Sequence, residues 1–86
     1  MVRARRWTVD VAVDEEEGST RARMVLDTPT GNRFTGVGLV QHGQRSARHP
    51  TIAAELAIAR ALTDLTEELL EAAAADLESI VLVAGS

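Results

Sequence analysis

Residues 51–78 read TIAAELAIARALTDLTEELLEAAAADLE, and this stretch decides the fold. Ala, Leu and Glu dominate it, and all three are strong helix formers. Pro50 suits the first position of a helix, because the N–H that it lacks has no partner there. Placing successive residues about 100° apart gathers the large apolar side chains in one broad arc. The sequence therefore predicts one long amphipathic helix, Thr51 to Glu78, that buries this arc. Its members are Ile52, Leu56, Ala59, Leu62, Leu69, Leu70, Ala73 and Leu77, flanked by Ile58 and Leu65.

The remaining side chains of this helix are mostly charged. Arg60 and Asp64 are spaced to pair across one turn. Asp64 to Glu67 resembles a capping box that could start a second helix, but no Gly or Pro lies between residues 51 and 84, so we expect no break. Glu55 falls inside the apolar arc. We interpret it as a carboxylate bound by a nearby Arg or by a backbone N–H in the first turn, rather than as a catalytic acid.

Three strands are predicted before the helix. Residues 7–14 alternate and place Trp7, Val9, Val11 and Val13 on one half-buried face. Residues 14–18 have the composition of a turn, with Gly18 suited to positive φ. Residues 27–32 give a second turn signal by their Pro, Gly and Asn. The second strand, residues 19–26, directs Arg21 and Arg23 outward. Its inward side chains are Thr20, Ala22, Met24 and Leu26.

The third strand, Arg33 to Gln41, has two candidate faces. Phe34, Gly36, Gly38 and Val40 share one face, while Thr35, Val37 and Leu39 share the other. We expect the glycine face to meet the helix, because glycine lets another backbone approach closely. Val37 and Leu39 would then form an apolar outer face, which indicates a partner surface. After the helix, residues 80–83 fit either a last helical turn or a short edge strand.

Composition narrows the functional classes. The chain has 86 residues, no cysteine and a formal net charge of −4. We expect one domain over residues 1–86 in the cytoplasm, with no disulfides, signal peptide or membrane span. No Ser-His-Asp set, metal cluster or facing carboxylate pair can be placed, so we predict no enzyme, cofactor, metal site or small-molecule substrate. His42 and His49 are interpreted as surface loop histidines.

Charge is divided unevenly along the chain. Residues 1–48 hold eight Arg and six acids, whereas residues 49–86 hold one Arg and seven acids. Phosphate binding would draw on the basic half. The candidate contacts to RNA or the ribosome are therefore Arg3, Arg5, Arg6, Arg21, Arg23, Arg33, Arg45 and Arg48.

Several motifs together resemble a small actinobacterial family of unknown function. They are Trp7-x-Val9, Ser19-Thr20-Arg21-Ala22, Gly36-Val37-Gly38 and Ile52-x-x-Glu55-Leu56-Ala57-x-x-Arg60-Ala61-Leu62-x-x-Leu65. The family is described as similar to double-stranded-RNA-binding domains, and some members are associated with hypoxia and dormancy and compared to ribosome hibernation-promoting factors. The resemblance covers nearly the whole chain and implies no catalytic residue or cofactor. The chain departs from the family at residues 44–46 and at Ala53-Ala54, and its acidic helix does not match the usual phosphate-binding helix.

The predicted fold is thus α+β: a three-stranded antiparallel meander followed by one long C-terminal helix, similar to a double-stranded-RNA-binding domain. Two functional hypotheses follow. The first is a stress or dormancy accessory protein that associates with the ribosome or RNA through its Arg-bearing sheet and loops. The alternative is a homodimeric protein–protein interaction module without nucleic-acid binding.

A homodimer is expected from lengths. The helix spans about 42 Å at ~1.5 Å per residue, whereas strands of this length reach only about 30 Å. The helix should therefore overhang its sheet with an apolar end that a second copy covers. The predicted interface is Val37, Leu39, Leu69, Leu70, Ala73, Leu77 and Ile80.

Overall fold

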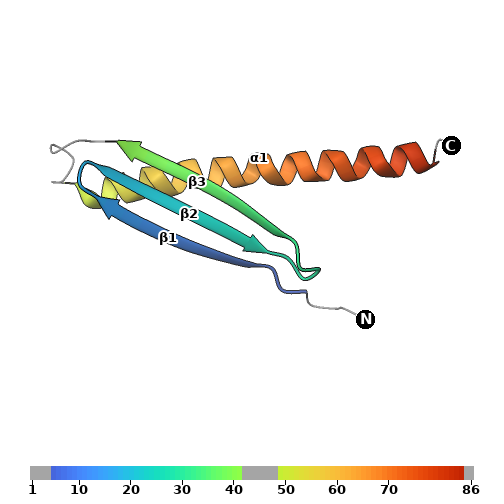
Figure 1. Cartoon of the computed structure of the whole chain (residues 1–86), viewed down its shortest axis with the longest axis horizontal. Coiled ribbons are helices and arrows are strands. Elements are labelled where there is room, and N and C mark those ends of the chain that lie inside the picture. Colours follow the sequence, from blue (N-terminus) through green and yellow to red (C-terminus); the bar gives the residue numbers. More distant parts are fainter. Residues whose placement is uncertain (1–4, 42–48, 85–86) are drawn as a thin grey trace.

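A three-stranded sheet lies against one long helix (Figure 1). The computed structural model describes residues 5–41 and 49–84, with side chains up to Val81. The elements are β1 (Thr8–Glu16), β2 (Ser19–Asp27), β3 (Arg33–Gln41) and α1 (Pro50–Ala84). The strands pair antiparallel in the order β1-β2-β3, which confirms the predicted meander and C-terminal helix. Because α1 runs unbroken to Ala84, residues 80–83 continue the helix instead of forming an edge strand.

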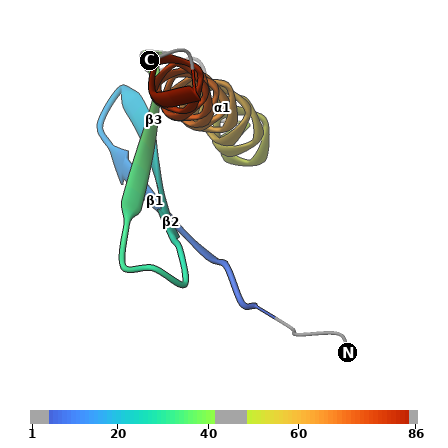
Figure 2. The same ribbon diagram turned by 90° about the vertical axis from the view of Figure 1, so that its right-hand side faces the viewer.

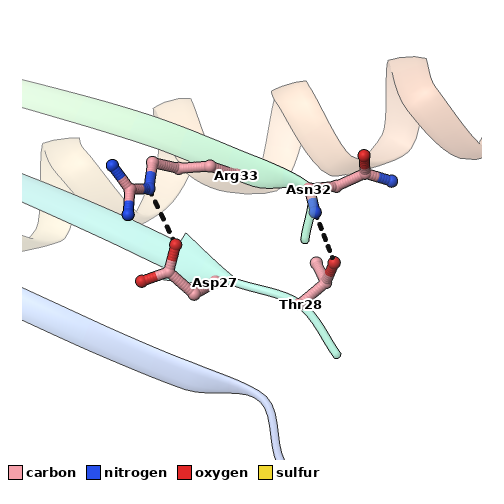
Figure 3. Close-up of polar contacts among 4 residues, drawn as sticks. All are labelled: Asp27, Thr28, Asn32 and Arg33. Atoms are coloured by element: carbon pink, nitrogen blue, oxygen red, sulfur yellow. Dashed lines mark hydrogen bonds and ion pairs between the residues drawn. The ribbon is translucent and has the colours of Figure 1, made fainter. Parts of the chain in front are cut away.

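Tight turns join the strands. Gly18 and Gly31 have φ values of 82° and 88°, which glycine adopts without the clash that a Cβ would cause. In the second turn the N–H of Asn32 donates to the Thr28 hydroxyl at 3.1 Å (Figure 3). The N–H of Thr28 donates to the carbonyl of Asn32 at 3.0 Å. The turns fix a register that groups the side chains on one face of the sheet.

That register decides which residues face α1. Met24 of β2 lies opposite Val11 of β1 and Gly36 of β3, so these three positions share one face. On β2 the inward residues Ala22, Met24 and Leu26 are buried, as the alternation predicted, and so is Thr20. The glycine face of β3 meets the helix, which confirms the expected orientation of that strand.

The helix approaches β3 very closely. A Cβ built on Gly38 would lie 2.5 Å from the backbone nitrogen of Ala61 and would overlap the carbonyl oxygen of Ala57. At Gly36 it would lie 2.7 Å from the backbone nitrogen of Leu65 and overlap the carbonyl oxygen of Ala61. Contact at this distance admits only small side chains between the backbones. The buried face of α1 is accordingly Ala53, Ala57 and Ala61, followed by Leu65.

The predicted buried arc of the helix is therefore wrong. Of that arc and its flanks only Leu65 is buried, while Ile58 and Leu69 pack partly against the core. Leu56 is 43% exposed and Leu70 is 65% exposed. The close approach at the glycines of β3 leaves room only for small side chains, so the alanine stripe of α1 faces the sheet. The large side chains, on the other side of α1, therefore point away from it. The other exposed members are Ile52, Ala59, Leu62, Ala73 and Leu77, and Glu55 is exposed beside them.

The prediction of a half-buried first strand is wrong for the single chain. Every residue of β1 is exposed, including Val9, Val11 and Val13, and so is Trp7. The three valines lie on the helix-facing side, but α1 packs over β3 and β2. A helix is about 10 Å across and strands lie ~4.8 Å apart, so one helix covers about two strands. Figure 2 views this arrangement down the long axis of the molecule, with α1 on one side of the sheet.

Candidate interaction surfaces

Two side chains of α1 close the outer edge of β3. Asp64 accepts a hydrogen bond from the N–H of Val37 at 2.9 Å through Oδ2. Arg60 donates from Nη1 to the carbonyl oxygen of Leu39 at 2.6 Å. The sequence predicted that Arg60 and Asp64 pair with each other, but both bind β3 backbone. They occupy groups that another strand would need, so this edge is protected against strand addition.

The outer face of the sheet carries the predicted arginines, and acids lie beside them. Arg33 donates from Nε to Oδ1 of Asp27 at 2.7 Å (Figure 3). This hydrogen bond raises the pKa of the Arg33 guanidinium above its ordinary value, and the charges of Asp27 and Asp10 act in the same direction. Arg21 lies opposite Asp14 in the register. Acidic neighbours therefore offset much of the positive charge on this face.

An open depression of about 330 Å³ lies on the same part of the sheet. Two carboxylates and two guanidinium groups line it, from Asp10, Asp27, Arg23 and Arg33. Opposite charges in equal number give it no strong preference for an anion. The remaining lining residues are Val11, Ala12 and Val25.

The structure brings together only part of the predicted RNA-contact set. Arg21 and Arg23 are exposed on β2, and no hydrogen bond or ion pair joins their side chains to the residues described. Arg33 is held by Asp27. Arg5 and Arg6 are exposed just before β1. Arg3, Arg45, Arg48 and His42 lie outside the described residues.

Exposed apolar side chains are the more extensive feature. Val37 and Leu39 project from the outer face of β3, and Leu70, Leu77 and Ile80 are exposed on the C-terminal half of α1, which extends past the sheet (Figure 1). Trp7 and the valines of β1 form a further apolar surface, which sequence reasoning missed because it assigned them to the core. Of the predicted interface, Ala73 is also exposed and Leu69 is half-buried.

The described part of the chain contains neither a metal-binding cluster nor a membrane-spanning helix. No group of three or more His, Asp or Glu side chains there is placed to hold a metal ion. No described helix is long and apolar enough to cross a membrane.

Comparison with known proteins identifies the family. Residues 5–84, which include all three strands and the helix, match the sequence profile of the Rv2632c-like family. The chain belongs to the Rv2632c-like family. This agrees with the predicted resemblance to a small actinobacterial family, whose likeness to RNA-binding domains and hibernation factors stays a prediction.

Two mycobacterial proteins illustrate the family. The chain is 39% identical over 74 residues to "Uncharacterized protein Mb1767" of Mycobacterium bovis (strain ATCC BAA-935 / AF2122/97), covering 86% of this chain and 78% of that protein. It is 37% identical over 71 residues to "Uncharacterized protein Rv2632c" of Mycobacterium tuberculosis (strain ATCC 25618 / H37Rv), covering 83% and 75% respectively. The matched stretches make up most of this chain and most of each relative.

Proposed function

We propose that this chain is a non-enzymatic protein–protein interaction module that works in the cytoplasm as a homodimer. The observation that supports this proposal most strongly is the amount of apolar surface that the single chain leaves exposed to water. Half of the buried hydrophobic residues are alanine, and the larger members of the core are Met24, Leu26, Val40 and Leu65. A core this small gives marginal stability.

The single chain exposes more apolar surface than a monomer needs to expose. Four apolar side chains at the start of the sheet and four at the end of the helix are each 36–66% exposed. Burying about half of each recovers on the order of 1 kcal/mol per side chain. They are Trp7, Val9, Val11, Val13, Leu70, Leu77, Ile80 and Val81.

Light scattering at micromolar concentration tests this proposal. We expect twice the 9.2 kDa chain mass for the wild type. Leu77→Asp combined with Ile80→Asp should give the single-chain mass, because each new charge would be buried by association. Ser79→Asp is the matched control: it adds a charge in the same turn at a polar position and should leave the mass unchanged. A wild-type chain of single mass would refute the homodimer.

A second candidate is association with the ribosome or RNA during stress or dormancy. The observation in its favour is the pair Arg21 and Arg23, exposed and without a partner among the described residues. Phosphate contacts by arginine would make such binding fall steeply with salt. The acids beside these arginines weigh against it.

Ribosome co-sedimentation at two salt concentrations tests the second candidate. Replacing Arg21, Arg23 and Arg33 by Glu should abolish binding. Asp10→Asn with Asp14→Asn should strengthen it, because this pair removes negative charge from the same face. If both sets of variants co-sediment like the wild type, the outer face of the sheet is not a nucleic-acid surface.

A further inference from the structure

Two apolar surfaces of the chain have no partner within it. The first, which we call the valine strip, consists of Val9, Val11 and Val13 on the helix-facing side of β1, with Trp7 just before them. The second, which we call the helix end, consists of Leu70, Leu77, Ile80 and Val81 on the C-terminal half of α1. All eight side chains are at least 36% exposed.

Apolar side chains of α1 border the valine strip. Arg60 and Asp64 mark the side of α1 that faces the outer edge of β3. Ile58 and Leu62, two residues to either side of Arg60, lie about 160° round the helix from it. They therefore lie on the side of α1 toward β1, where Ile58 is half-buried and Leu62 is 48% exposed. The valine strip and these two side chains are therefore neighbouring apolar surfaces, one on the sheet and one on α1.

The directions of the elements are set by the same hydrogen bonds. Asp64 binds Val37 and Arg60 binds Leu39, so α1 runs antiparallel to β3. Both β1 and β3 are antiparallel to β2, hence α1 is also antiparallel to β1. A two-fold axis perpendicular to α1 makes a second helix antiparallel to the first. That second helix then runs in the same direction as β1.

We infer that the helix end of a second copy of this chain lies on the valine strip, beside α1. The inference rests on the proposed homodimer and specifies its interface. By symmetry, the helix end of each copy covers the valine strip of the other copy. The dimer therefore contains this contact twice, and both unpartnered surfaces of each copy are covered.

Lengths and charges support this occupant. Val9 to Val13 spans about 14 Å of strand, and Leu70 to Ile80 spans about 15 Å of helix. In the parallel direction derived above, the start of the valine strip meets the start of the helix end. Arg5 and Arg6 precede the strip, whereas Glu67 and Glu71 border the start of the helix end. The starts of the two surfaces thus carry opposite charges.

Two other arrangements of two copies account for less. Pairing of β1 with a second β1 about Ala12 would place Asp10 opposite Asp14 of the other copy, and like charges at opposed positions are unfavourable. Back-to-back pairing of helices through Leu56 and Leu77 would cover the helix end but leave the valine strip in water. Only the arrangement proposed here buries both surfaces.

Cysteine cross-linking tests the interface, because the natural chain contains no cysteine. Val11→Cys and Leu77→Cys chains are refolded together and oxidised at micromolar concentration. We expect a disulfide-linked species of twice the chain mass in the mixture and little in either variant alone. Val11→Cys mixed with Ser79→Cys is the matched control and should not cross-link, because Ser79 lies about 160° round the helix from Leu77.

A second pair tests the direction of the helix end. Val13→Cys should cross-link with Ile80→Cys more readily than with Leu70→Cys. Cross-linking of Leu77→Cys alone, or of Leu56→Cys with Leu77→Cys in place of Val11→Cys, would overturn the inference in favour of a helix–helix seam. In that event the proposed homodimer stands. A wild-type chain of single mass in light scattering would overturn both.

Discussion

Replacing Gly38 by Ala perturbs the contact on which the fold depends. The added Cβ would overlap the carbonyl oxygen of Ala57 and lie 2.5 Å from the backbone nitrogen of Ala61. Both atoms belong to the helix backbone and cannot rotate away, so α1 must move outward as a body. The buried alanine stripe would then lose part of its contact with β2 and β3, because even a gap of 0.5–1 Å forfeits roughly a quarter to a half of the dispersion energy.

The expected net loss is about 2–2.5 kcal/mol. Overpacking of this kind typically costs ~1–3 kcal/mol, and rigid backbone partners place Gly38 at the upper end. The better strand propensity of Ala returns roughly 0.5–1 kcal/mol. For a domain of this size the loss lowers Tm by about 10–20 °C. Differential scanning calorimetry at a fixed chain concentration measures it, since the stability of a dimer depends on concentration.

A double variant sharpens the test. Gly36→Ala meets the same stretch of α1, so one outward shift of the helix relieves both overlaps. The combined loss should be clearly smaller than the sum of the single losses. Gly31→Ala is the control, because nothing lies within 4 Å of its added Cβ and its cost comes from its positive φ alone; it should add to Gly38→Ala. A Gly38→Ala chain as stable as the wild type would refute the close approach.

Three further substitutions probe the remaining contacts. Ala61→Leu should destabilise the chain by ~1–3 kcal/mol in urea unfolding, whereas Ala59→Leu, two residues away on the exposed side, should be nearly neutral; equal effects would contradict the orientation of α1. Asp64→Ala removes the acceptor of the Val37 N–H and should cost ~1 kcal/mol and increase aggregation measured by turbidity, while Thr63→Ala should not increase aggregation. Arg33→Ala removes an exposed ion pair and should leave the urea midpoint almost unchanged at any salt concentration.

Local patterns predicted the sheet well. The alternation of Thr20 to Leu26, the turns at Gly18 and Gly31, and the glycine face of β3 each depend on residues close in sequence. The orientation of α1 did not follow from such a pattern. The periodicity argument took the face with the larger and more hydrophobic side chains as the buried face. Packing against Gly36 and Gly38 instead selected the smallest side chains of the helix. The exposure of β1 depends on the width of a helix relative to three strands, which no local pattern contains.

The candidate surfaces were predictable to a lesser extent. The apolar overhang of α1 followed from its length, and the exposure of Val37 and Leu39 followed from the glycine face. Arg60 and Asp64 have a spacing that also fits a pair on the helix surface, so their contact with the edge of β3 appears only in three dimensions. The exposure of the valine strip could not be predicted from the sequence, because its alternation is that of a strand with one buried face.

Trp7 fluorescence tests most directly whether a second copy covers the valine strip. It is the only tryptophan in the chain and is 56% exposed in the single chain. We predict a blue-shifted emission protected from acrylamide at micromolar concentration. The emission should shift to the red and become open to quenching on dilution, and in the Leu77→Asp, Ile80→Asp variant at any concentration. Emission typical of a solvent-exposed tryptophan in the wild type, unchanged from high to low concentration, would contradict the account.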